Sequence, residues 1–307
     1  MKKVRTPRTK WKLKRNWPLH LMVAPALLLL LLFSYAPMPG IVMAFQDYKP
    51  WLGFANSEWV GIRHFTTIFT LGKPVQVILN TLVISVYKMV FGLLVPVLFA
   101  VLLNEIRRMW LKRSIQTLVY LPHFLSWVIL GGILIDLLSV EGGLVNQTLH
   151  ALFGWRPIFF LGDGDWFRFS VIVSDIWKEF GFSTIIFLAA LSSINPEMYE
   201  AALIDGANRF KMAIHITLPS MTAIVIVVAT LSLGNVLNAN FDQIFNLYNP
   251  LVMDKGDIID TYVYREGLLG AKFSFSAAVG LFKSVVGLVL ILAGYRLAYR
   301  FANYRIF

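Results

Sequence analysis

The sequence of 307 residues contains no cysteine and few charged residues. Without cysteine the chain has no disulfide bond, no thiol nucleophile and no metal site built on thiolates. Charged residues make up only 15% of the chain and hydrophobic residues 57%, whereas a soluble domain is about 25% charged. This balance excludes an ordinary soluble domain and indicates a protein embedded in a membrane.

Motifs for nucleotide binding and catalysis are also missing. The glycine-lysine runs at 72–74 and 270–272 lack the spacing of G-x-x-x-x-G-K-[ST]. The five histidines are scattered, and no Ser/His/Asp set is recognisable. The Asp-Gly-Asp run at 163–165 departs from the calcium-loop pattern and is better explained as a solvated turn. The sequence therefore predicts no enzymatic activity, no metal site and no cofactor bound by this chain.

Long apolar segments dominate what is present. A helix needs roughly 20 apolar residues to cross a bilayer. Six segments approach or exceed that length, at 19–44, 74–103, 114–138, 167–191, 220–245 and 277–299. The first follows a basic tail, as a signal peptide would, but it is longer than one and five more segments follow. We therefore expect an all-α membrane protein with six transmembrane helices, the first a retained anchor.

The distribution of Lys and Arg predicts the orientation in the membrane. The tail at 1–18, the loops after the second and fourth segments and the C-terminus carry seventeen of them, and the opposite loops carry seven. The positive-inside rule then places both termini and the loop at 192–219 in the cytoplasm. The net charge of +11 is thus explained by topology, and no nucleic-acid partner is predicted. The chain divides into a basic tail, 1–18, and a six-helix domain, 19–307.

The loop at 192–219 has the signals of a short, rigid helix. Asn195 is a good N-cap, and Pro196 suits the first helical position. Gly206 supplies a left-handed end to the helix. A rigid polar elbow on the cytoplasmic side is typical of a docking site for a partner.

Charged residues inside apolar segments are costly and therefore informative. Lys88 and Lys283 lie near the middle of their segments, so we expect them to face the interior of the bundle. Asp175 and Lys178 are three residues apart on one helix face. They are interpreted either as a structural ion pair or as the lining of a polar translocation cavity.

The fifth segment carries a polar stripe. Asn235, Asn238, Asp242 and Asn246 follow a spacing of i, i+3, i+7 and i+11, which is one face of a continuous helix. Amide and carboxylate groups suit sugar hydroxyls, because they donate or accept in fixed directions. Hydrogen bonding between helices is the alternative explanation.

Tryptophans mark the predicted outer loops. Trp51, Trp59, Trp155 and Trp166 suit the interface between water and membrane lipids. Contact with an extracellular binding protein is the other interpretation.

The string around the elbow resembles a known family motif. An E-A-A run followed by three residues, a Gly, nine further residues and I-x-L-P resembles the EAA loop of binding-protein-dependent ABC importer permeases. The matching positions are Glu200, Ala201, Ala202, Asp205, Gly206, Ile216, Leu218 and Pro219. A chance match in an ordinary amphipathic loop helix is the alternative, and it would have to reproduce this fixed spacing.

The resemblance extends over nearly the whole chain. Residues 20–22 and Pro25, and segments at 34–40, 44–50, 177–182, 193–197, 245–250, 257–265 and 280–285, are similar to the LplB-like branch of carbohydrate permeases. That branch is linked to uptake of oligosaccharides and polysaccharides, including acidic ones such as alginate and pectin fragments. The resemblance implies a type I ABC importer permease fold in a bacterial inner membrane.

The same resemblance implies partners and a mechanism. A second permease subunit forms a heterodimer with this chain, two ATPase subunits hold ATP and Mg²⁺, and an extracytoplasmic solute-binding protein delivers the substrate. The elbow inserts into the ATPase, and closure of the ATP-bound dimer opens the spans outward. On this view Lys178 and Lys283 attract acidic sugars into the cavity. The alternatives are a type I permease for another solute, or a stand-alone secondary carrier or channel.

Overall fold

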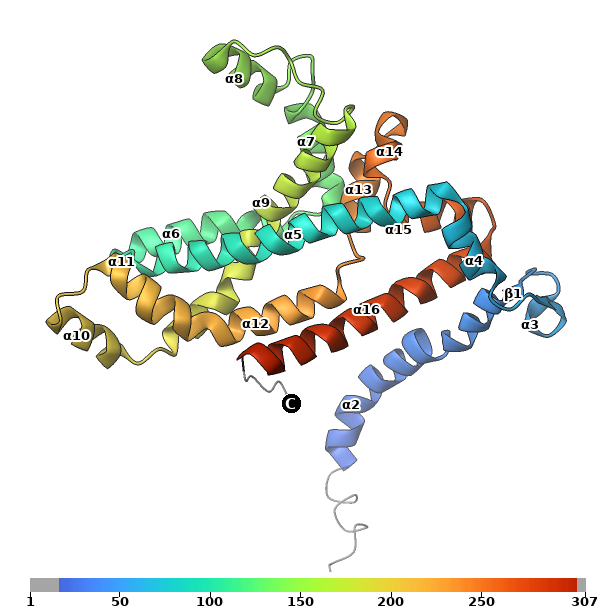
Figure 1. Cartoon of the computed structure of the whole chain (residues 1–307), viewed down its shortest axis with the longest axis horizontal. Helices are drawn as coiled ribbons and strands as arrows, with labels where there is room; N and C mark the ends of the chain where they lie inside the picture. Colours follow the sequence, from blue (N-terminus) through green and yellow to red (C-terminus); the bar gives the residue numbers. More distant parts are fainter. Residues whose placement is uncertain (1–16, 303–307) are drawn as a thin grey trace, which may run out of the picture.

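The computed structural model describes residues 17–302, which are almost entirely helical (Figure 1). The first half contains α2 (Trp17–Leu30), α3 (Gly53–Asn56), α4 (Arg63–Thr70), α5 (Gly72–Asn104), α6 (Met109–Tyr120), α7 (Trp127–Leu137) and α8 (Leu144–Phe153). The second half contains α9 (Gly164–Ser192), α10 (Pro196–Ile204), α11 (Arg209–Met212), α12 (Leu218–Gly234), α13 (Phe241–Leu247), α14 (Met253–Gly256), α15 (Ile259–Val263) and α16 (Phe273–Ala302). Of the predicted basic tail, only the last two residues fall in this range.

Short irregular turns and one small ladder join these helices. Turns with π or 3-10 geometry cover η1 (Leu31–Tyr35), η2 (Met38–Phe45), η3 (Leu121–Phe124), η4 (Ala213–Thr217), η5 (Pro250–Val252) and η6 (Tyr264–Leu269). The strands β1 (Gln46–Asp47) and β2 (Glu58–Trp59) pair antiparallel, with Gln46 opposite Trp59.

Four helical segments within residues 17–302 are long and apolar enough to cross a membrane. They are Trp17–Phe45, Gly72–Asn104, Arg209–Gly234 and Phe273–Arg296. A fifth candidate is the bent pair Met109–Phe124 and Trp127–Leu137. The 29 residues of α9 would extend about 43 Å, well beyond a hydrocarbon core of about 30 Å, but this helix carries charged residues in its middle.

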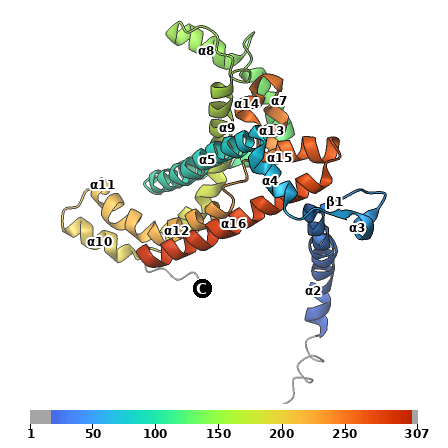
Figure 2. The ribbon, with the colours of Figure 1, turned by 45° about the vertical axis from the view of Figure 1, so that its right-hand side comes forward.

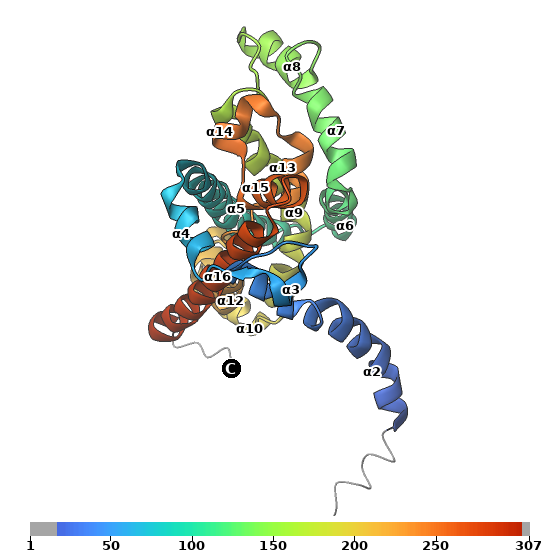
Figure 3. The same cartoon turned by 90° about the vertical axis from the view of Figure 1, so that its right-hand side faces the viewer.

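The long helices run from one end of the molecule to the other. α12 packs against both α5 and α16, and α5 packs along α9. α10 and α11 lie at one end of this bundle, and α4 and β1 lie at the opposite end (Figures 1 and 2). α2 points away from the bundle (Figure 3). No residue in the most apolar stretch of Trp17–Phe45 is buried. η2, which follows α2, packs on α16.

Three apolar clusters hold the bundle together. The first joins α4, α5, α15 and α16, and includes Ile68 and Tyr262. The second, around Phe167 and Ile244, joins α5, α9 and α13. The third, around Phe187, joins α5, α9 and α12. α5 contributes to all three clusters and α9 to two of them.

The third predicted span, 114–138, is broken rather than continuous. α6 and α7 meet at an angle of 102°. Pro122 lies in the intervening 3-10 turn, and Ser126 caps α7 by accepting a hydrogen bond from the Ile129 N–H at 3.3 Å. Because a proline and a capping serine both favour an interruption, the break follows from residues inside the apolar run.

The fifth predicted span, 220–245, is also wrong as one helix. α12 ends at Gly234, and α13 begins only at Phe241. Between them the chain is non-helical, and Asn240 has a φ of 73°, which asparagine tolerates better than most residues. Its side chain accepts a hydrogen bond from the Gln243 N–H, so it caps α13. Asn235 of the predicted stripe therefore ends α12, and Asn240, which lies outside that stripe, starts α13.

The contact between α6 and α9 depends on one glycine. A methyl group on Gly181 would lie 2.0 Å from the carbonyl oxygen of Val119. Gly181→Ala should therefore push the two helices apart and destabilise the chain by about 1–3 kcal/mol. The matched control is Gly92→Ala, in α5, because a methyl group added there would meet no neighbouring atom within 4 Å. Thermal unfolding of the purified protein measures both, and equal midpoints for the two variants would contradict the close packing.

Candidate functional site

The loop at 192–219 is a short helix with a defined start and a defined end. The Asn195 side chain accepts a hydrogen bond from the backbone two residues ahead, and α10 begins at Pro196, so both parts of the predicted start are confirmed. Gly206 has a φ of 76°, as predicted for the end. The N–H groups of Gly206 and Ala207 bond back to carbonyls of the last turn, which is a Schellman cap.

α10 presents an exposed surface with one free acid. The Glu200 side chain is exposed, and its carboxylate makes no hydrogen bond or ion pair within residues 17–302. Large apolar side chains surround this end of the molecule: Ile204 is 88% exposed and Phe210 73% exposed. Contiguous exposed apolar groups on a structured element are typical of an interaction site.

The remaining motif residues lie on α10 and its C-terminal end, and at η4 and the start of α12. Ala201, Asp205 and Pro219 are exposed or half-buried at the surface, as are Ala202, Ile216 and Leu218. The loop is tied back by the Tyr199 hydroxyl, which lies 3.0 Å from the Thr217 hydroxyl, and by Arg209, which lies 3.6 Å from Glu105. These contacts fix the orientation of α10 relative to α5 and α12.

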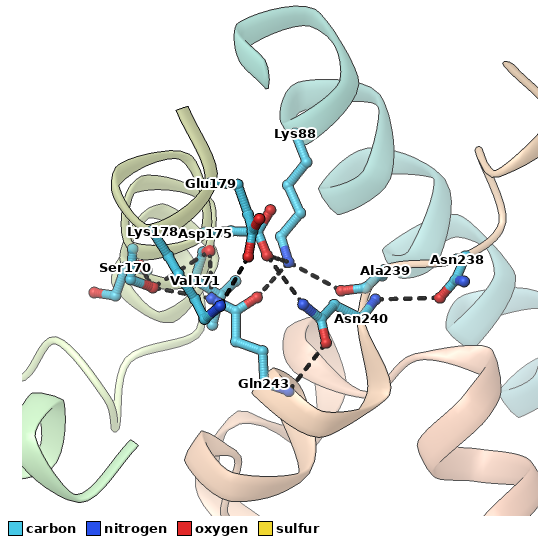
Figure 4. A network of polar contacts seen from close by, with 11 residues as sticks. Lys88, Ser170, Val171, Asp175, Lys178, Glu179, Asn238, Ala239, Asn240 and Gln243 are labelled. Atoms are coloured by element: carbon cyan, nitrogen blue, oxygen red, sulfur yellow. Dashed lines mark hydrogen bonds and ion pairs between the residues drawn. The ribbon is translucent and has the colours of Figure 1, made fainter. Parts of the chain in front are cut away.

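A second candidate site lies at the break between α12 and α13, where Lys88 is buried. Its ammonium group donates to the Ala239 carbonyl at 2.9 Å and to the Gln243 side-chain oxygen (Figure 4). Asp175, on α9, supplies the compensating charge at 3.2 Å. Lys88 therefore faces the bundle interior, as predicted, and joins α5, α9 and the broken segment at one point.

The side chains around Lys88 are bonded to one another. Asn240 donates to Asp175 Oδ1 at 3.2 Å. Gln243 is completely buried and donates to the Val171 carbonyl at 2.7 Å and to the Ser174 hydroxyl at 2.9 Å. Because a buried polar group without a partner is costly, this saturation explains how amides are accommodated among apolar helices.

The predicted ion pair between Asp175 and Lys178 is not present. Lys178 instead contacts Glu179 at 2.9 Å and donates to the His123 carbonyl at 2.8 Å. The His123 ring closes this group, with Nδ1 2.7 Å from the second Glu179 oxygen. The i, i+3 spacing places both charges on the same side of α9. Asp175 nevertheless pairs with Lys88 on α5, and Lys178 pairs with its sequence neighbour Glu179.

The polar stripe predicted on the fifth span is divided between two places. Asn235 and Asn238 line a cavity of about 470 Å³ between the break and α16, together with Lys283. Lys283 is paired with Asp260, at 2.6 Å. The prediction that Lys283 faces inward is thus confirmed in part, since it borders this cavity but carries a compensated charge.

Asp242 and Asn246 lie away from that cavity, on α13. Asn246 donates to the Asp242 carbonyl at 2.7 Å and packs against Gly131 of α7. The Asp242 side chain is exposed. The four residues therefore do not form one face, because the helix that would align them ends at Gly234.

Sequence reasoning missed several members of these sites. Gln243, Asn240, Asp260 and His123 are all bonded partners of the buried charges. The sequence did indicate that such partners exist, because each charge inside an apolar segment requires one. Which partner it finds depends on helix contacts that the spacing alone does not contain. Within residues 17–302, no cluster of three His, Asp or Glu suits a metal ion.

The Lys88 pair should be tested by a double-mutant cycle. Lys88→Met alone leaves the half-buried Asp175 without its ion-pair partner, and should destabilise the protein by about 3–5 kcal/mol. Combining it with Asp175→Leu should restore much of that loss, since both charges are then removed. Lys73→Met, at the exposed start of the same helix, is the control. Additive effects in thermal unfolding of the two substitutions would show that Lys88 and Asp175 are not coupled.

Comparisons with known proteins agree with this geometry. The family of binding-protein-dependent transport system inner membrane components matches residues 92–303. The polygalacturonan/rhamnogalacturonan transport system permease protein YteP of Bacillus subtilis is 44% identical, over 98% of this chain and 94% of that protein. Protein LplB of the same organism is 44% identical over 94% of this chain and 91% of its own length.

Solved structures show the same fold. A chain of a bacterial ABC transporter involved in the import of the acidic polysaccharide alginate superimposes with a TM-score of 0.87 at 39% identity, covering 96% of this chain and 99% of that chain. The alginate transporter in complex with a pentasaccharide-bound periplasmic protein gives 0.88 at 38% identity, covering 98% and 100%. The chain therefore belongs to the inner membrane components of binding-protein-dependent transport systems, with the permease fold of ABC importers.

Proposed function

We propose that this chain is the transmembrane permease subunit of an ATP-driven importer that takes up a carbohydrate by alternating access. The observation that carries the proposal is the preformed elbow of α10, capped at both ends, with its acid and apolar groups exposed. The named relatives and the alginate transporter support a carbohydrate, in particular an oligosaccharide or acidic polysaccharide. The chain itself would be non-catalytic.

The assembly follows from the same argument. The exposed elbow docks on an ATPase, so two ATPase subunits holding ATP and Mg²⁺ supply the energy. A second permease subunit completes a heterodimer, and an extracytoplasmic binding protein delivers the solute, as the complex with a periplasmic protein supports. We infer six spans, with α9 as the fourth, both termini in the cytoplasm, and a location in a bacterial inner membrane.

The path for the solute is proposed along the break in span five. Asn235 and Asn238 present amides to the cavity beside α16. The interior lysines do not supply free positive charge, because Lys88, Lys178 and Lys283 are each paired with an acid. The proposed path therefore recognises hydroxyl groups through amides, and Lys178 acts on structure rather than on an acidic sugar.

The proposed function is tested by uptake into proteoliposomes. The assembled complex, with ATP inside and its binding protein outside, should accumulate labelled oligogalacturonate only when ATP is present. Glu200→Lys should lower this uptake about tenfold or more, because it reverses the charge on the docking surface. Glu58→Lys, at the opposite end of the molecule, is the matched charge reversal. Unchanged uptake with Glu200→Lys would contradict the proposed coupling, and uptake without ATP would favour a secondary carrier.

Assembly with the ATPase depends on the end of α10. Gly206→Val places a β-branched residue at a φ of 76° and should displace the elbow, so that less ATPase co-purifies. Gly154→Val imposes the same backbone strain at a φ of 68° in the loop after α8, also with no neighbouring atom within 4 Å. Co-purification and thermal midpoint are measured for both. A loss of ATPase that is equal in the two variants would show general misfolding rather than a docking defect.

A further inference from the structure

A separate cavity lies at the end of the molecule opposite α10. It has a volume of about 390 Å³, within the range of roughly 300–1,000 Å³ usual for small-ligand sites. Three segments line it: the β1 turn, the nearby α4, and, distant in sequence, the chain from α15 to the start of α16. These elements lie together in Figures 1 and 3. The cavity is distinct from the proposed path, which passes the break after α12.

The walls of this outer cavity are held by specific contacts. The Tyr48 N–H donates to the Ser274 hydroxyl at 2.8 Å, across 226 residues of sequence. The His64 Nε2 lies 3.0 Å from the Gln46 carbonyl, which fixes α4 against β1. Ala271 borders the cavity with a φ of 52°, a conformation that a non-glycine residue rarely adopts. The enclosure is therefore a defined structural feature and not a gap between loose loops.

Tyr262 places an unused hydroxyl in this cavity. The residue is only 6% exposed, and its ring is fixed between Phe275, at 6.1 Å between ring centres, and Arg265, at 5.7 Å. Arg265 is itself held by the buried Asp257 at 2.5 Å. Within residues 17–302 the hydroxyl has no hydrogen-bond partner, and its oxygen is not fully buried, so a ligand in the cavity that Tyr262 lines can reach it. The Tyr262 hydroxyl is therefore held in a fixed position and is free to bond to a ligand.

The charges around the cavity compensate one another. Lys272 donates to Glu266 at 2.6 Å, and this contact lowers the pKa of Glu266 and raises the pKa of Lys272. Asp47 lies 3.7 Å from Lys49. An ionic ligand would have to displace these partners. A ligand with hydroxyl groups can instead donate to the carboxylates and accept from Tyr262 while the ion pairs stay intact.

We propose that this outer cavity binds a terminal sugar ring through its hydroxyl groups, with Tyr262, Glu266 and His64 as the contacting residues. The aromatic side chains of Tyr48 and Phe273 supply apolar walls of the kind that small-ligand sites combine with a few polar groups. The inference rests on the proposed carbohydrate function and adds a second sugar site, outside the translocation path. Because recognition uses hydroxyls, a neutral sugar and its uronate should bind alike.

The test uses the assembled complex in nanodiscs without its binding protein. The probes are α-1,4-galactobiose and α-1,4-digalacturonate, which differ only in the carboxylates, and binding is followed by saturation-transfer NMR and titration. Tyr262→Phe keeps the ring and its packing, and should weaken both probes roughly three- to tenfold, as expected for one lost hydrogen bond. Tyr264→Phe is the matched control, because Tyr264 packs on Phe241 and Phe245 outside the cavity. Leu71→Trp, at the exposed rim, should block both probes by filling the space.

The outcomes separate this inference from the proposed function. Weaker binding of both probes in Tyr262→Phe and blocked binding in Leu71→Trp, with binding intact in Tyr264→Phe, support the site. Absence of binding to the unaltered complex, or wild-type affinity in both cavity variants, overturns it. If only digalacturonate binds, recognition by hydroxyls is wrong. If neither sugar binds, and a separate titration with the binding protein shows that Leu71→Trp weakens its docking, the cavity receives a protein side chain and the inference fails. ATP-driven uptake that persists in any of these cases leaves the proposed function standing.

Discussion

A lysine ammonium buried among apolar helices is the constraint on which the middle of this bundle depends. Removing an ion from water costs several kcal/mol even in a relaxed protein, so Lys88 must be compensated where it lies. Asp175 supplies the charge, and the Ala239 carbonyl and Gln243 side chain supply acceptors. The Ala239 carbonyl belongs to the non-helical stretch between α12 and α13. The break leaves the Ala239 carbonyl without a helical hydrogen bond, and the Lys88 ammonium donates to it. The break therefore supplies an acceptor for the buried lysine, and the lysine supplies a donor for the free carbonyl.

α9 provides the fixed frame for both broken spans. Asp175 faces the break of span five, and Lys178 and Glu179 contact His123 at the break of span three. Both groups come from little more than one turn of the same helix. The charges of Asp175, Lys178 and Glu179 are compensated by Lys88, by His123 and by one another, so α9 can carry several ionised groups among apolar helices. These charged residues are the reason that α9 is less apolar than the other long helices.

Local signals in the sequence predicted local structure well. The cap at Asn195, the start at Pro196 and the left-handed Gly206 were predictable because each depends on the backbone of its own turn. The long apolar runs likewise predicted the helices, since length and composition determine both. The break after Gly234 was missed, because an apolar average over 220–245 hides the asparagines that stop the helix. The partners of Lys88, Lys178 and Lys283 could not be predicted, because spacing along one helix does not determine which neighbour a charge meets.

The two candidate sites are connected through the same pair of helices. α9 enters the loop at 192–219 and α12 leaves it, and the contact of Tyr199 with Thr217 holds the loop against the start of α12. Further into the bundle, Asp175 on α9 bonds to Asn240, just beyond the end of α12. α12 alone would span about 26 Å between these points. In the proposed mechanism, a displacement of α10 would be delivered to two helices that are joined again at the Lys88 network. With these packed helices moving as rigid bodies, it would reach the break between α12 and α13, where the backbone lacks helical hydrogen bonds and can change its path.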